Sequence, residues 1–156
     1  MQKTSTKAAT ATRRVQSTYR LEDQVGFLLR RAYQRASSNL IERIGPYDLT
    51  APQFATLARL YERGALSQNL LGRLVAMEPA NIRDVVQRLK KRRLVSTGRD
   101  PGDARLILVG LTSTGISLIQ DLLPIEMECT ARTLAGFNAN EKKVLYELLD
   151  RLAQPA

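Results

Sequence analysis

Histidine and tryptophan are absent from this chain of 156 residues, and cysteine occurs once. Without histidine or clustered cysteines, the chain has no imidazole for acid–base catalysis and no Cys/His metal site. It also has no glycine-rich phosphate loop, so we expect no enzyme activity, cofactor or metal. A lone cysteine cannot form an internal disulfide, which favours a cytoplasmic location. No apolar run approaches the length of a membrane span, so we expect no membrane partner.

Positive charge is in excess, with 24 Lys and Arg against 15 Asp and Glu and a net charge of +9. The excess is local: residues 81–105 hold eight basic and three acidic side chains, whereas residues 112–156 hold four basic and six acidic ones. Such a concentrated basic region predicts a nucleic-acid partner.

The first 20 residues contain five basic side chains, no acidic one and almost no large apolar one. This composition predicts a disordered basic arm over residues 1–20, and the length of residues 21–156 is typical of a single domain. Two roles are open for the arm: extra phosphate contacts with a nucleic acid, or a passive tail.

Residues 67–112 are predicted to form a helix, a turn, a second helix and a β-hairpin. Ser67 is a good N-cap, and leucines follow it at helical spacing. Glu78 and Pro79 indicate the start of the second helix, because an acidic residue followed by proline suits a helix N-terminus. A stripe of apolar residues predicts the buried face of this second helix. The stripe consists of Ile82, Val85, Val86 and Leu89.

The opposite face of the second helix is polar and basic, so it can form hydrogen bonds with base edges. β-prone runs at residues 94–97 and 104–109 flank G-R-D-P-G-D, which is typical of a turn. Together these features predict a helix-turn-helix with a wing over residues 48–112, in a mainly α fold. The alternative is an ordinary helical hairpin with a solvated face. The outward side chains are Ala80, Asn81, Arg83, Asp84, Gln87, Arg88 and Lys91.

Two amphipathic helical regions flank this unit, at residues 21–45 and 112–153. Thr112 is expected to cap the first helix after the wing, and Asn140 the last helix. Between the first region and Ser67, T-A-P-Q predicts a capping box of Thr50 and Gln53. We expect the flanking helices to pair across a two-fold axis in a homodimer, because a duplex reader needs paired half-sites. The alternative is packing within a single-chain bundle.

Two motifs surround the wing: L-x-x-x-x-L-V before it and D-x-R-x-x-x-x-x-L-T-x-x-G after its tip. Their residues are Leu89, Leu94, Val95, Asp103, Arg105, Leu111, Thr112 and Gly115. Over about residues 20–152 the chain resembles the MarR family of winged helix-turn-helix regulators. Y-D-L-T-A-P-Q-F and M-E-P-A-N-I-R resemble members that control aromatic-acid catabolism of the nicotinate or hydroxycinnamate type. Two residues depart from the family: Arg93 replaces a usual glycine, which argues against a left-handed turn, and Ala104 replaces a basic residue.

The resemblance implies a homodimeric repressor that binds a pseudo-palindromic operator and releases it when a small molecule binds. In the family, the Asp of D-x-R orients its Arg, which enters the minor groove of double-stranded DNA; these residues are Asp103 and Arg105 here. The alternative is an ordinary salt bridge within the hairpin. The predicted DNA-binding residues are Ser67, Gln68, Asn81, Arg83, Gln87, Arg88, Arg99, Asp103 and Arg105.

The resemblance also implies a small aromatic acid as effector, bound between the dimerisation helices and the helix-turn-helix. Such a ligand needs an apolar wall and a cation. Phe27 and Arg31 lie one turn apart, off the main apolar stripe, and Phe54 is a candidate for the opposite wall. Alternatively, both phenylalanines are core residues and Arg31 is a surface charge. The predicted ligand-binding residues are Tyr19, Arg20, Phe27, Arg31 and Phe54.

Two other functions remain open: an architectural DNA-binding protein without an effector, and a redox-sensing regulator that uses Cys129. Glu126 and Glu128 are close to Cys129 in the sequence, and neighbouring carboxylates raise the pKa of a thiol. We therefore interpret Cys129 as structural.

Overall fold

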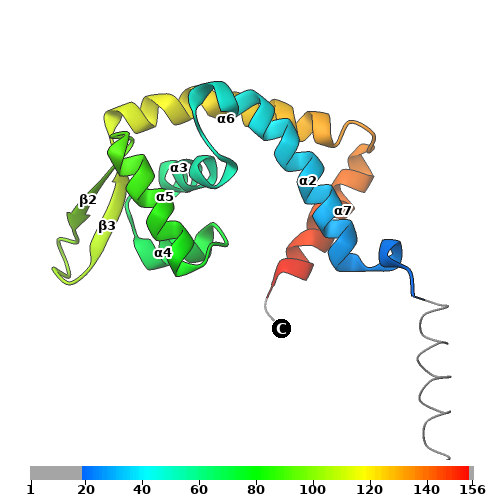
Figure 1. The fold of residues 1–156 in the computed structure, drawn as a ribbon, viewed down its shortest axis with the longest axis horizontal. Coiled ribbons are helices and arrows are strands. Elements are labelled where there is room, and N and C mark those ends of the chain that lie inside the picture. The colour runs from blue at the N-terminus through cyan, green and yellow to red at the C-terminus, as the bar shows by residue number, and fades with distance from the viewer. Residues whose placement is uncertain (1–18, 155–156) are drawn as a thin grey trace, which may run out of the picture. The chain divides into compact units, whose positions relative to one another are not determined.

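The computed structural model describes residues 19–154 and divides into two compact units, residues 1–35 and residues 36–156. Most of the predicted basic arm lies outside the described residues. None of the helices in residues 19–154 is long and apolar enough to cross a membrane. The elements are η1 (Leu21–Asp23), α2 (Val25–Ile44), η2 (Gly45–Tyr47), α3 (Ala51–Arg63), β1 (Leu66–Ser67), α4 (Gln68–Leu74), α5 (Pro79–Lys91), β2 (Val95–Arg99), β3 (Ile107–Leu111), α6 (Ser113–Thr133) and α7 (Ala139–Ala153) (Figure 1).

The helix-turn-helix and wing form as the sequence predicts, and they confirm a mainly α fold with a small sheet. Helix α4 and helix α5 are joined by a short turn, and α5 is the second helix, which the sequence predicts to contact DNA; it is named the reader helix from here on. The hairpin of β2 and β3 is the wing, and it projects beside α5 (Figure 1).

Local capping determines where the helices begin. The backbone N–H of Gln53 donates to the Thr50 hydroxyl at 3.4 Å, and that of Thr50 donates to Oε1 of Gln53 at 2.9 Å. This is the predicted capping box, and it satisfies two backbone donors that α3 itself leaves without partners. Ser67 and Thr112 also cap their helices as expected.

The predicted cap of the last helix is wrong by two residues. Asn138 is the N-cap of α7: its side chain accepts from the backbone N–H of Glu141 at 3.0 Å, while the Glu141 carboxylate accepts from the Asn138 backbone. Asn140 lies inside the first turn of α7. The reciprocal bond from Glu141 explains the choice, because an asparagine three residues before a glutamate can form a capping box.

The sheet has three strands, one more than the hairpin that the sequence predicts. Its order is β1-β3-β2, and both pairings are antiparallel. Strand β1 contains only Leu66 and Ser67, which pair with Val109 and Leu108. Through this pairing the wing is joined directly to the residue that caps α4.

The hydrophobic core of residues 36–156 lies where α3, α5, α6 and the sheet meet. Ile82, Val86 and Leu89 are buried, which confirms the apolar stripe of the reader helix, whereas Val85 is half-buried. They pack in one cluster with buried residues of the neighbouring elements. Those residues include Leu57, Leu60, Leu71, Leu94, Val109, Ile119 and Leu122.

The apolar stripes of the flanking helices stay exposed in the single chain. Within Ala139–Ala153 no residue is buried, and Leu148 in the middle of the α7 stripe is 52% exposed. In residues 19–35, which form the other unit, Val25 is 61% exposed and Leu28 is exposed as well. Amphipathic helices normally bury such stripes against a partner.

The reader helix ends in a left-handed residue, although the glycine expected there is missing. Arg93 has φ 58°. The backbone N–H of Leu94 donates to Leu89 O at 3.0 Å, and that of Arg93 donates to Lys90 O at 2.9 Å. These two bonds are those of a Schellman motif, so the expectation that Arg93 argues against a left-handed turn is wrong. The arginine adopts the strained conformation because the core position of Leu94 fixes the chain direction.

Helix α6 begins against this same turn. Thr112 donates its backbone N–H to Leu94 O at 3.1 Å, and its hydroxyl donates to Arg93 O at 2.6 Å. A Cβ on Gly115 would overlap the Leu94 carbonyl oxygen, so only glycine allows α6 to approach this closely. This contact explains why the L-T-x-x-G motif needs both the threonine and the glycine.

We expect Arg93→Gly to be more stable than Arg93→Ala by about 1 kcal/mol, because glycine removes the Cβ that strains a left-handed residue. Both variants lose the same charge, so the comparison isolates the backbone conformation. Urea unfolding followed by circular dichroism measures the difference. Equal stabilities would show that the turn is not strained.

Candidate nucleic-acid interface

The reader helix α5 presents its predicted outward side chains to solvent. Asn81, Arg83, Gln87 and Arg88 are all exposed, opposite the buried stripe. None of these four forms an ion pair with another residue of the described chain. Amide groups form bidentate hydrogen bonds with the edge of adenine in the major groove, and guanidinium groups form them with the edge of guanine.

The two predicted contact residues of the first helix have more restricted positions. Ser67 is half-buried, ends strand β1 and accepts from the backbone N–H of Leu70 at 3.4 Å. Its hydroxyl proton is still available to an acceptor such as a phosphate oxygen. Gln68 is half-buried at the first position of α4.

The tip of the wing is built by aspartate side chains that bind the backbone. Oδ1 of Asp100 accepts from the backbone N–H groups of Gly102 at 2.6 Å and Asp103 at 3.1 Å. The Asp100 backbone N–H donates to Leu106 O at 2.9 Å and closes the tip. These bonds give the G-R-D-P-G-D turn a defined shape.

Asp103 orients Arg105 through the main chain. Its Oδ1 accepts from the backbone N–H of Arg105 at 2.9 Å, and no ion pair of residues 19–154 joins the two side chains. The hairpin salt bridge that the sequence left open as the alternative is therefore absent between these two residues, and Asp103 forms an Asx turn instead. The guanidinium of Arg105 is exposed, as is that of Arg99 on the neighbouring strand.

Four consecutive basic residues, Lys90 to Arg93, end the reader helix, and their separate roles are visible only in the structure. Lys90 Nζ donates to the Thr97 hydroxyl of the wing at 2.8 Å. Arg92 donates to the backbone oxygens of Tyr47, at 2.9 Å, and of Asp48. The run K-K-R-R in the sequence could have indicated that these residues have a role of their own. The run thus fixes the reader helix to the wing and to the corner before α3.

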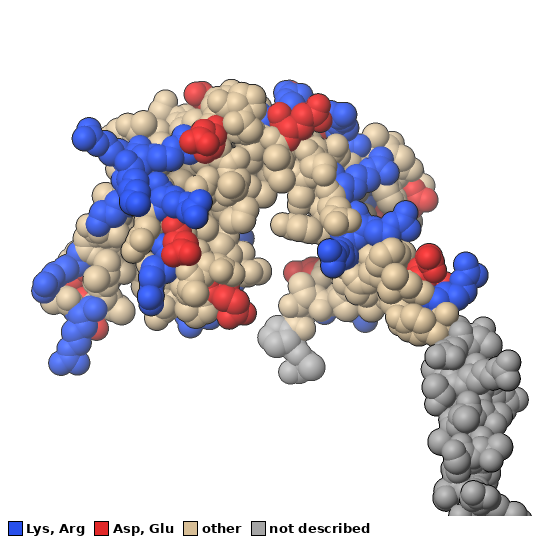
Figure 2. Space-filling view, in the orientation of Figure 1, with Lys and Arg blue, Asp and Glu red and all other residues tan. Residues whose placement is uncertain are grey.

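Basic side chains gather over α5 and the wing in the space-filling view (Figure 2). They surround the base-reading face with positive charge, which attracts the phosphates of a duplex. The exposed ones on these elements are Arg83, Arg88, Lys90, Lys91, Arg93, Arg99 and Arg105. The predicted basic region therefore extends over the reader helix and the wing.

The predicted ligand residues fall into two groups. In residues 19–35, the Arg31 guanidinium lies over the Phe27 ring, 5.8 Å from its centroid, and Tyr19 and Arg20 are exposed. In the other unit, Phe54 is 7% exposed and belongs to the hydrophobic core. Its burial favours the alternative that the sequence left open, in which Phe54 is a core residue.

Cys129 is buried on α6, and its Sγ donates to the backbone oxygen of Asn39 at 3.3 Å. Burial is the main cause that raises the pKa of the Cys129 thiol; Glu126 adds to the rise and Arg43 opposes it. The sequence had assigned the rise to the carboxylates, which are a smaller cause than burial. A buried thiol with a raised pKa is a weak nucleophile.

Comparison with known proteins agrees with this geometry. The MarR family model matches residues 47–106. The repressor NicR of Pseudomonas putida is 37% identical over 134 residues, which span 86% of this chain and 85% of NicR. The chain belongs to the MarR family. It is accordingly a DNA-binding transcriptional regulator and not an enzyme.

Two solved structures resemble this chain over most of their length. A probable transcriptional regulator from Pseudomonas aeruginosa is 43% identical with a TM-score of 0.78, covering 85% of this chain and 99% of that one. BpsR of Bordetella bronchiseptica, whose DNA binding is regulated by 6-hydroxynicotinic acid, is 36% identical with a TM-score of 0.83. Its match covers 88% of this chain and 99% of BpsR.

For this MarR-family regulator, we expect Arg105→Ala to weaken operator binding by about 1–3 kcal/mol, because the wing loses its groove contact. Asp103→Asn keeps an oxygen acceptor for the Arg105 backbone, so it should bind the operator with close to wild-type affinity. Asp103→Ala loses this acceptor and should bind the operator more weakly. Fluorescence anisotropy with labelled operator measures all three. If Arg105→Ala bound the operator with wild-type affinity, the wing would not be part of the DNA interface.

Proposed function

We propose that this protein is a homodimeric repressor that binds a pseudo-palindromic operator and releases it when a small aromatic acid binds. The observation that carries the proposal is the exposed polar face of the reader helix, flanked by a basic wing. Asn81 and Gln87 supply base-edge donors and acceptors on that face, Arg88 adds a cation at its edge, and Arg105 supplies a cation at the wing. The similarity to NicR, a repressor, supports the direction of regulation.

Dimerisation is supported by the exposed apolar stripes of the flanking helices. Helix α7 exposes Val144, Leu148, Leu149 and Leu152 along one stripe, and residues 19–35 expose several large apolar side chains. A symmetric dimer would bury these surfaces and present two reader helices to half-sites about one helical turn of DNA apart.

Sedimentation velocity at micromolar concentration should therefore show a dimer. Leu148→Glu places a charge in the middle of the α7 stripe, and we expect it to shift the population toward monomer. Lys143→Glu, on the same helix but outside the stripe, is the control and should remain dimeric. A wild-type chain that sediments as a stable monomer would contradict the proposed assembly.

The effector is proposed to be a small aromatic acid, of the class represented by 6-hydroxynicotinic acid in BpsR. Support from this chain comes from Phe27 and Arg31, which place an aromatic face beside a cation in the first unit. A flat carboxylate ligand can stack on the ring and pair with the guanidinium. Arg43, another arginine of α2, is already paired with Glu128 at 3.0 Å.

We propose that the acid releases DNA by shifting the dimer between two conformations. The dimer exchanges between a spacing of the two reader helices that fits adjacent major grooves and one that does not. An acid that binds the second state more tightly removes the protein from DNA in proportion to that difference in affinity. An architectural DNA-binding protein would show no such response. The burial of Cys129 gives no support to a redox-sensing function.

We expect Arg31→Ala to abolish the response to 6-hydroxynicotinic acid while leaving DNA affinity without ligand unchanged, because the carboxylate loses its cation. Arg30→Ala, the neighbouring exposed arginine on α2, is the matched control and should respond as the wild type does. Operator anisotropy during titration with the acid measures both.

If Arg31→Ala still releases DNA at the wild-type concentration of acid, the carboxylate partner is another residue, and Arg20 is the next to replace. If none of the aromatic acids in a broad panel makes the wild type release DNA, the proposed effector class is wrong.

A further inference from the structure

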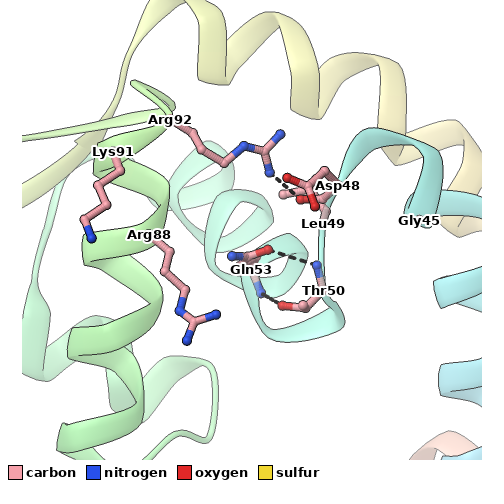
Figure 3. A pocket seen from close by; sticks show the side chains of 8 residues that line it. All are labelled: Gly45, Asp48, Leu49, Thr50, Gln53, Arg88, Lys91 and Arg92. Carbon is pink, nitrogen blue, oxygen red and sulfur yellow. Dashed lines mark hydrogen bonds between the residues drawn. The ribbon is translucent and has the colours of Figure 1, made fainter.

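A cavity of about 390 Å³ lies between the N-terminal end of α3, the corner that precedes it and the C-terminal half of α5 (Figure 3). Arg88, Lys91 and Arg92 line it from the reader helix and its C-cap, whereas Thr50 and Gln53 line it from α3. Asp48 supplies the single carboxylate, at the end of the cavity where Arg92 lies (Figure 3). Three cations and one carboxylate leave the lining positive, which favours an anion.

Gln53 indicates where the anion would sit. The residue is only 7% exposed, and its Oε1 is occupied by the bond from the Thr50 backbone. The amide nitrogen, Nε2, therefore points away from Thr50 and toward α5, into the cavity (Figure 3). No acceptor within residues 19–154 is bonded to Nε2. Nε2 is not one of the buried polar atoms of residues 19–154 that lack a partner, so it reaches solvent through the cavity and can donate to an anion that enters.

The position of the cavity relative to the wing identifies the source of that acceptor. Lys90 bonds to Thr97 of the wing, whereas Arg88 faces the cavity. Two residues apart on a helix, these side chains point about 200° apart, so the wing and the cavity flank opposite sides of the base-reading face. A helix in the major groove, which is about 12 Å wide, has a phosphate backbone on each side.

We propose that this cavity binds a backbone phosphate of the operator, on the edge of the major groove opposite the wing. The Gln53 amide donates to a phosphate oxygen, and Arg88 and Lys91 supply opposite charge. The N-terminal end of α3 adds the positive end of its helix dipole. Arg92 stays bonded to the corner carbonyls and holds the cavity wall in place. This role rests on the proposed DNA-binding function and adds a contact that fixes the reader helix on both of its flanks.

Gln53→Glu is the decisive variant, because glutamate preserves the capping box and nearly the same volume while replacing the amide donors with an anionic oxygen. We expect its melting temperature to be close to that of the wild type. Its affinity should fall about tenfold or more, by a similar factor for the operator and for an unrelated duplex, because phosphate contacts carry no sequence information.

Lys91→Gln tests the charge separately, and it should reduce the slope of log affinity against log salt by about one. Lys143→Gln, an exposed lysine on α7, changes the net charge by the same amount and is the matched control. Its affinity and salt slope should stay at the wild-type values.

Two further measurements distinguish a backbone phosphate of DNA from a free anion as the ligand of the cavity. Operators that carry one neutral methylphosphonate at successive positions should include one position at which wild-type binding weakens and Gln53→Glu binding does not. Titration with inorganic phosphate, followed by thermal shift, measures the affinity for the free anion.

Unchanged affinity and salt slope in both Gln53→Glu and Lys91→Gln, with wild-type DNA binding intact, would overturn the phosphate site alone. Stabilisation by inorganic phosphate that depends on Gln53, without any effect of Gln53→Glu on DNA binding, would assign the cavity to a free anion and equally overturn the proposal. A wild type that binds no duplex at all would overturn the proposed function itself.

Discussion

The carbonyl oxygen of Leu94 is the point on which the helix-turn-helix and wing depend. The reader helix ends immediately before it, the wing strand β2 begins after it, and the backbone and hydroxyl of Thr112 both bond to it at 3.1 and 3.2 Å. Gly115 leaves the space that this approach requires. Because Leu94 itself is in the core, the turn at Arg93 must bend backward to reach it, even though an arginine is strained there. Packing has overridden local preference at this position.

The features that could be predicted from the sequence are those determined over a few residues or by periodicity. The capping box of Thr50, the proline start of α5 and the apolar stripe of the reader helix all depend on local spacing, and all three are present. Strand β1 could not be found this way, because two residues carry no alternation pattern and their pairing with β3 is decided by tertiary packing. The shift of the last cap to Asn138 was accessible, since Glu141 stands three residues after it.

For the candidate interface, the sequence predicted which side chains face outward but not what their neighbours are. Periodicity orders the residues of α5 by angle, and this was sufficient for Asn81 and Gln87. It does not reveal that Lys90 bonds to the wing, or that Asp103 binds a backbone N–H instead of the guanidinium of Arg105. Bonds between a side chain and the main chain leave no pattern in the partner's residue type. Phe54 could not be assigned to the core or to a ligand wall from the sequence, because both positions suit an apolar aromatic side chain.

The bonds of Arg92 to the backbone oxygens of Tyr47 and Asp48 have a consequence for how this corner changes during evolution. A carbonyl oxygen is present whatever side chain the residue carries, so residues 47 and 48 can be replaced without loss of the acceptors, provided that the backbone keeps its course. For this contact only position 92 needs a particular side chain; position 48 is restricted by its left-handed backbone, φ 54°, and not by the bond. The contact therefore produces no correlated pair of substitutions among descendants of this sequence, and methods that infer proximity from covariation would pass over it.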